Sequence, residues 1–143
     1  MGSRRRAREH ALQVLYQIDQ AGTGVDETLE LFWDAWSGDD DEGTLFASQL
    51  VRGVTEHQER IDKIIEDYSI NWKLHRMPAV DRNVLRIAVY EFLECDDIPV
   101  MVSINEAIEL GKRFSTGESG AFINGILDKI SRSVEIDKDQ KAS

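Results

Sequence analysis

Apolar residues recur every three to four positions along most of the chain, which is the spacing of an amphipathic helix. No stretch alternates apolar and polar residues for long enough to indicate a strand, and prolines occur only at Pro78 and Pro99. The pattern therefore predicts an all-α fold of about seven helices.

Three helices are expected in the first half of the chain. The first begins among arginines, ends near Ala21 and Gly22, and buries one apolar stripe. The second covers about 26–36 and is followed by a turn-rich acidic segment at 37–44. A single long helix is expected over about 45–68. The stripe on the first helix comprises Ala7, Ala11, Val14, Leu15 and Ile18.

The second half is expected to have one central helix. Pro78 suits the first turn of this helix, which runs to about Glu94 and is apolar over more than half of its circumference. Glu91 lies within the apolar sector, where an ionised carboxylate needs a hydrogen-bonding partner. We therefore expect Glu91 to be a structural acceptor and not a catalytic acid, because no second titratable residue is placed beside it by sequence.

Two segments have the pattern of a capping box, in which a serine and a glutamate three residues later satisfy free amides at a helix start. Ser103–Glu106 predicts a helix that begins near Ser103, and Ser115–Glu118 predicts the start of the last helix. We expect one domain over 1–143, with a three-helix bundle at 1–70, a second helical bundle at 71–135 and a flexible tail at 136–143.

Charge is distributed unevenly along the chain. It carries 17 Lys and Arg against 27 Asp and Glu, a net charge of −10, yet Arg4, Arg5, Arg6 and Arg8 fall within five positions. A uniformly basic nucleic-acid binder is excluded. An acidic body with a local basic arm remains possible, because attraction to phosphate acts within a Debye length of ~8–10 Å. The alternative, which a charge run alone favours, is an ordinary arginine-rich helical turn.

The residue types that carry catalysis or bind metals show no useful spacing. His10, His57 and His75 lie far apart, and the carboxylates at 39–42 lack the alternate spacing of a calcium loop. We expect no catalysis, metal or cofactor. The single Cys95 excludes an internal disulfide, and no apolar run approaches the ~20 residues of a membrane span. A cytoplasmic protein without membrane contact is therefore expected.

Tyr16 falls on the side of the first helix opposite its apolar stripe, with Leu12, Glu9 and Arg5 near it. We expect Tyr16 to be exposed and, with Leu12, to contact another protein. The alternative is that Tyr16 is one of the single exposed aromatic residues that are common on protein surfaces.

Phe122 shares a line on the last helix with Glu118, Gly125 and Lys129. Spacing alone leaves two interpretations open: Phe122 is an edge of the core, or it stacks on a base while Lys129 holds a phosphate. The turn at 117–120 also precedes a helix, so its free amides could hold a phosphate, although Glu118 competes for the same amides.

Three segments resemble the bacterial NusB family of transcription antitermination factors. They are RRRARExALQxLYQ at 4–17, AVDRNVLRIAVYEFL at 79–93 and VSINEAIELGKRFSTGESGAFINGILDKI at 102–130. Together they cover about half of the chain, while 20–75 agrees only in its helical layout. The resemblance implies an all-α fold of two helical subdomains and no catalysis.

The resemblance also implies partners: boxA RNA of ribosomal RNA leaders, the ribosomal protein NusE, and NusA, NusG and RNA polymerase in a larger complex in the bacterial cytoplasm. Residues that match the family's RNA surface are Arg4, Arg5, Arg6, Arg8, Phe114, Glu118 and Phe122, to which the spacing argument adds Lys129. Residues assigned to the NusE contact are Tyr16 and Asp81, with Leu12 beside Tyr16. If four arginines neutralise phosphates on single-stranded RNA, the logarithm of the binding constant should fall with the logarithm of the salt concentration with a slope of about −3, which we call the salt slope.

Two alternatives to this function remain. One is a helical adaptor whose arginines pair with an acidic protein, without specific RNA binding. The other is the NusB-like domain found attached to RNA cytosine methyltransferases, although no strand-rich, glycine-rich catalytic segment follows in this sequence.

Overall fold

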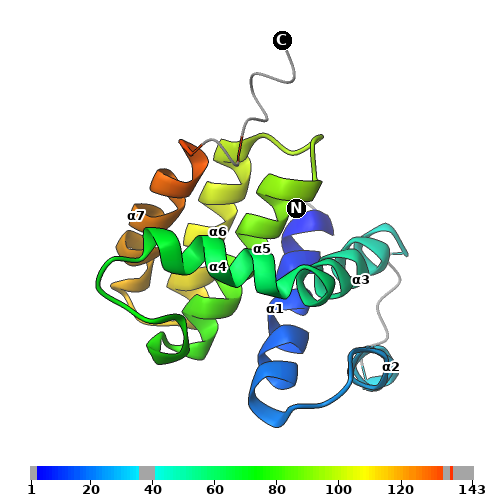
Figure 1. The fold of residues 1–143 in the computed structure, drawn as a ribbon. Coiled ribbons are helices and arrows are strands. Elements are labelled where there is room, and N and C mark those ends of the chain that lie inside the picture. The colour runs from blue at the N-terminus through cyan, green and yellow to red at the C-terminus, as the bar shows by residue number, and fades with distance from the viewer. Residues whose placement is uncertain (1–2, 36–40, 134–135, 137–143) are drawn as a thin grey trace.

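The computed structural model of the protein describes residues 3–35, 41–133 and 136. These residues form seven α-helices and one 3-10 helix, with no strand among them, so the predicted all-α class is confirmed (Figure 1). The elements are α1 (Ser3–Ala21), α2 (Val25–Ala35), α3 (Asp41–Glu56), α4 (Gln58–Tyr68), η1 (Leu74–Arg76), α5 (Ala79–Glu94), α6 (Val100–Phe114) and α7 (Ser119–Ser131). Trp36, the acidic segment up to 40 and the predicted tail beyond 136 lie outside the described residues.

Helix α5 is the centre of the fold. Every residue from Asp81 to Phe92 is buried, because α1, α3, α4, α6 and α7 all pack against α5. Figure 1 shows α6 and α7 on one side of α5, and α1 with α3 on the other. This burial explains why the helix is apolar over most of its circumference. Among the described residues, no helix combines the length and apolarity that a membrane span requires.

Helix α1 follows its predicted pattern closely. Its apolar stripe is buried, with Ile18 partly so, and the helix ends at Ala21 as expected. Gly22 has φ of +69°, and its amide donates to the Ile18 carbonyl at 2.8 Å. Glycine tolerates this left-handed conformation without a steric cost, which accounts for the position of the helix end.

The single helix predicted over 45–68 is wrong, because α3 and α4 are separate helices that meet at His57. Helix α3 packs on α1 while α4 packs on α5 and α7, so the chain must change direction between them. The buried residues on either side of the break, Val54 and Ile61, are seven positions apart and therefore preserve the helical period. Helix α3 also starts at Asp41, so the end of the predicted acidic loop is helical.

Both predicted capping boxes are wrong. Helix α6 begins at Val100 after Pro99, so Ser103 lies inside the helix and its hydroxyl donates to Glu91 at 2.6 Å. Helix α7 begins at Ser119, and Glu118 at its N-cap makes no side-chain capping bond. The Ser103 hydroxyl satisfies a buried carboxylate instead of a helix amide.

Glu91 is the acceptor in a buried polar cluster. Arg8 donates to its two carboxylate oxygens at 2.7 and 2.9 Å, and Ser103 supplies the third hydrogen bond. Arg8 and Glu91 are only 4% and 1% exposed. This confirms that Glu91 needs a partner, and the two-pronged geometry of the pair fixes α1 against α5.

A second polar network, which the sequence analysis missed, joins α5 to α1 and α4. Arg82 donates to Asp19 at 2.7 and 2.9 Å, and Arg86 donates to Asp62 at 2.8 and 3.0 Å. Asn83 donates to Asp19 at 3.0 Å. The two acceptors lie on helices other than α5, with Asp19 on α1 and Asp62 on α4, so sequence spacing could not have revealed the network.

Replacing Glu91 with alanine should lower the free energy of unfolding by about 3–5 kcal/mol, because the Arg8 guanidinium would stay buried without its counter-ion. Urea denaturation checks this, with Lys63→Ala as the control. Lys63 pairs with Asp67 on the exposed surface, so its loss should cost at most about 1 kcal/mol. Equal, small effects of the two substitutions would contradict the structural role of the buried pair.

Candidate nucleic-acid interface

The four arginines in the first turns of α1 differ in their exposure to solvent. Arg4, Arg5 and Arg6 are exposed, whereas Arg8 is buried against Glu91. At about 100° per residue, Arg8 lies on the same side of the helix as the buried Leu15. The expectation that Arg8 meets RNA is therefore wrong, since its guanidinium is already engaged in the core.

Arg4 and Arg5 are exposed but already paired with carboxylates. Arg4 donates to Asp97 at 3.0 Å, and its guanidinium lies 4.8 Å from the centre of the Phe46 ring. Arg5 donates twice to Glu106, at 3.1 and 2.7 Å. The hydrogen bond from Arg5 holds the pKa of the Glu106 carboxyl below its usual range, although partial burial acts in the opposite direction. A phosphate that approaches Arg5 must therefore compete with an ionised carboxylate.

Arg6 is exposed and forms no ion pair with any residue that the structure describes. Its charge lowers the pKa of the neighbouring His10 imidazole, although burial of the ring is the larger cause. The Arg6 guanidinium can therefore meet a phosphate without first leaving a carboxylate.

A seam of charged residues between α1 and α6 leads away from the arginine turn. Arg5 pairs with Glu106, and Glu9 accepts from Arg113 at 2.6 Å, so the pairs follow the same order along both helices. Arg113 also lies 5.4 Å from the ring centre of Phe114, at the end of α6. The seam thus connects the arginine turn to the turn between α6 and α7, where Glu118 is exposed.

Phe122 lies beyond that turn, at the edge of the core. Its ring is partly buried and packs edge to face against Trp72, with the ring centres 6.2 Å apart. The two rings border a hollow of about 360 Å³, whose other lining residues are Pro78, Asp81, Thr116, Glu118 and Ser119. Lys129 is exposed further along α7 and does not line the hollow. Trp72 could not be assigned to the site from the sequence, because its segment has no periodic pattern.

The residues predicted to contact another protein differ in their exposure to solvent. Tyr16 is 43% exposed, as predicted. Leu12 is only 2% exposed, so the prediction that it joins Tyr16 on the surface is wrong; the covered sector of α1 is wider than the apolar stripe. Asp81 is 4% exposed and accepts hydrogen bonds from the Ser119 hydroxyl at 2.9 and 3.1 Å. Its carboxylate therefore ties α5 to α7 instead of standing free on the surface.

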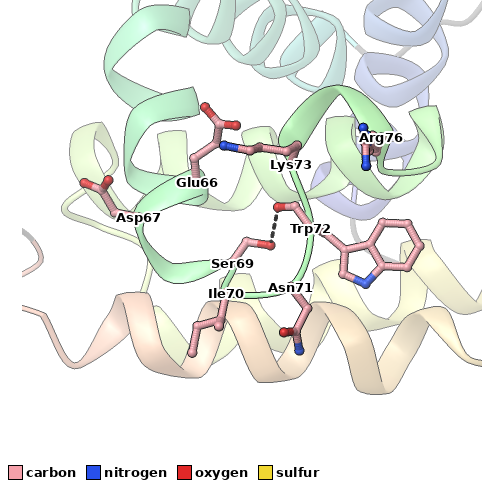
Figure 2. A pocket seen from close by; sticks show the side chains of 8 residues that line it. All are labelled: Glu66, Asp67, Ser69, Ile70, Asn71, Trp72, Lys73 and Arg76. Atoms are coloured by element: carbon pink, nitrogen blue, oxygen red, sulfur yellow. Dashed lines mark hydrogen bonds between the residues drawn. The ribbon is translucent and has the colours of Figure 1, made fainter.

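A further hollow, of about 720 Å³, surrounds the segment between α4 and η1 (Figure 2). Its lining mixes acidic and basic side chains, among them Glu66, Lys73 and Arg76. The Ser69 hydroxyl donates to the Trp72 carbonyl at 2.9 Å, which braces the segment. Trp72 lines both this hollow and the one beside Phe122.

Comparison with known proteins agrees with this architecture. The NusB family model matches residues 5–132. The transcription antitermination protein NusB of Desulfatibacillum aliphaticivorans is 53% identical over 142 residues, which cover 99% of this chain and 97% of that protein.

Two solved structures are also similar. A structure of T. maritima NusB has a TM-score of 0.86 at 37% identity and covers 98% of this chain and 97% of that one. A crystal structure of the antitermination factors NusB and NusE in complex with dsRNA includes a chain with a TM-score of 0.82 at 28% identity, covering 90% of this chain and 95% of that one. The matches extend over nearly the whole length, and the chain belongs to the NusB family.

Proposed function

We propose that the protein is a transcription antitermination factor that binds RNA through the exposed arginines of α1 and acts together with NusE. The observation that carries the proposal is the cluster Arg4, Arg5 and Arg6, exposed on an otherwise acidic member of the NusB family. Relatives are transcription antitermination proteins, and one similar structure holds NusB and NusE with RNA. We further propose that the RNA it binds is the boxA element of ribosomal RNA leaders, and that it assembles with NusA, NusG and RNA polymerase.

The charge distribution supports a division of labour between the protein and its partner. Because Arg8 is buried, at most three arginines of the turn can neutralise phosphates, and the salt slope on single-stranded RNA falls to about −2. The net charge of −10 repels RNA elsewhere on the protein. A basic partner docked on the acidic surface would add RNA contacts and charge complementarity.

Replacing Arg5 and Arg6 together with alanine should weaken binding of a boxA-type RNA by about tenfold or more and change the salt slope from about −2 to about −0.7. The fold should remain intact, since both side chains are exposed. Fluorescence anisotropy across a salt series measures both quantities. Replacement of Arg60 and Arg132 makes the same change in net charge away from the turn and should have little effect; equal losses in the two variants would overturn the assignment.

Replacing Glu106 with glutamine should tighten RNA binding by about fivefold, because Arg5 would no longer be held by a carboxylate. The pKa of Glu106 lies below its usual range, so the carboxylate is ionised throughout pH 6–8 and the gain should not vary with pH there. Glu109→Gln on the same helix is the charge-matched control. The same gain in both variants would indicate a general charge effect and contradict competition for Arg5.

Replacing Tyr16 with alanine should weaken the pairing with NusE by about tenfold or more, because exposed aromatic residues commonly anchor interfaces. Isothermal calorimetry with purified NusE measures this change. RNA binding by the isolated variant should be unaltered, and Leu45→Ala, which truncates an exposed apolar side chain on α3, should leave NusE binding unchanged. An unaffected heterodimer would exclude Tyr16 from the contact.

A further inference from the structure

Trp72 is displayed on a braced segment of the surface. It lies between α4 and η1 and is 48% exposed. The Ser69 hydroxyl donates to the Trp72 carbonyl at 2.9 Å. The amide of Leu74, two residues further on, donates to the Glu66 carboxylate at 3.2 Å. Figure 2 shows the indole projecting out of the segment, away from the side chain of Ile70. The backbone bonds fix the segment without occupying the ring.

The indole forms a wall shared by two hollows. Its ring and that of Phe122 meet edge to face, with the ring planes 73° apart, and both residues line the hollow of about 360 Å³. Trp72 also lines the hollow that contains Lys73 and Arg76. A flat aromatic wall beside a hollow is suited to a planar ring, because stacking requires one open face.

The charged groups around the smaller hollow are hydrogen-bond acceptors. Asp81 and Glu118 contribute carboxylates, of which that of Glu118 is exposed, and no lysine or arginine lines the hollow. A phosphate would be repelled here, but the N–H edge of a nucleobase would find acceptors. Phosphates would be attracted instead to Lys73 and Arg76, which line the other hollow that Trp72 borders.

We propose that Trp72 and Phe122 form an aromatic platform that stacks one unpaired base of the bound RNA. The exposed carboxylate of Glu118 accepts a hydrogen bond from the edge of that base, and the flanking phosphate lies toward Arg76. The inference rests on the proposed function and deepens it by assigning a base-contacting residue. The seam between α1 and α6 offers the RNA strand a path from the arginine turn to the platform. Its last basic residue, Arg113, pairs with Glu9 and lies over the ring of Phe114, next to the turn that carries Glu118.

Replacing Trp72 with leucine should weaken binding of a boxA-type RNA by about 5- to 100-fold, the range expected for loss of one stacked base. Leucine retains an apolar contact for Phe122, so the fold should persist, as urea denaturation would verify. Trp72→Phe should retain most of the affinity. Ile70→Ala is the matched control, because Ile70 belongs to the same segment and is 81% exposed; it should bind normally.

An abasic scan of the RNA separates stacking from a merely structural role. Removing the one base that stacks on Trp72 should weaken binding to the wild-type protein but have almost no further effect on Trp72→Leu. Removing any other base should weaken both proteins by the same factor. A Trp72→Leu defect that is equal at every RNA position, or that follows a loss of stability, would overturn the platform.

The same measurements distinguish this inference from the proposed function. Normal RNA binding by Trp72→Leu, alongside a defect in the Arg5 and Arg6 double variant, would overturn the platform alone. Absence of RNA binding by the wild-type protein, even with NusE, would overturn the proposed function as well. Weakened NusE binding with unchanged RNA binding would make Trp72 part of a protein interface and would also overturn the platform.

Discussion

The buried pair between Arg8 and Glu91 determines how the rest of the surface is presented. It joins the beginning of α1 to the last turn of α5, the helix on which most of the others pack. With Arg8 fixed inward, the rotation of α1 is set, and Arg6, about 200° away around the helix, must lie on its exposed side. Arg4 lies on the same face as Arg8 and is exposed at the start of the helix. A buried ion pair contributes little net stability compared with apolar packing, but it strongly penalises any other rotation of the helix.

The same arginine run therefore has two physical roles. Arg8 is structural because it is buried against Glu91, which also accepts from Ser103, whereas Arg5 is held at the surface by a carboxylate that a phosphate can displace. Acidic residues around the turn lower its affinity for RNA, and they also limit binding to unrelated polyanions. The proposed function therefore implies that tight RNA binding requires the partner, because the basic site is small and partly masked by carboxylates.

Periodic segments of the fold could be predicted from the sequence, because each helix must bury one stripe. The stripe of α1 and the central position of α5 both follow from this rule. The break at His57 could not be predicted, since Val54 and Ile61 preserve the helical period across it. Ser103 matches the spacing of a helix cap. Its actual partner, Glu91, is twelve positions away in sequence and leaves no local signal.

The candidate site was predictable in part for the same reason. Exposure of Tyr16 follows from the helical period, but burial of Leu12 and Arg8 depends on how widely the neighbouring helices cover α1. Trp72 lies in an irregular segment, so only the three-dimensional structure places it beside Phe122.

The most direct test of the account is the affinity of the protein for boxA-type RNA and a scrambled control, measured across a salt series with and without NusE. The account predicts modest binding by the protein alone with a salt slope of about −2, and tighter, boxA-selective binding when NusE is present. Equal affinity for the two RNAs, even in the presence of NusE, would contradict it.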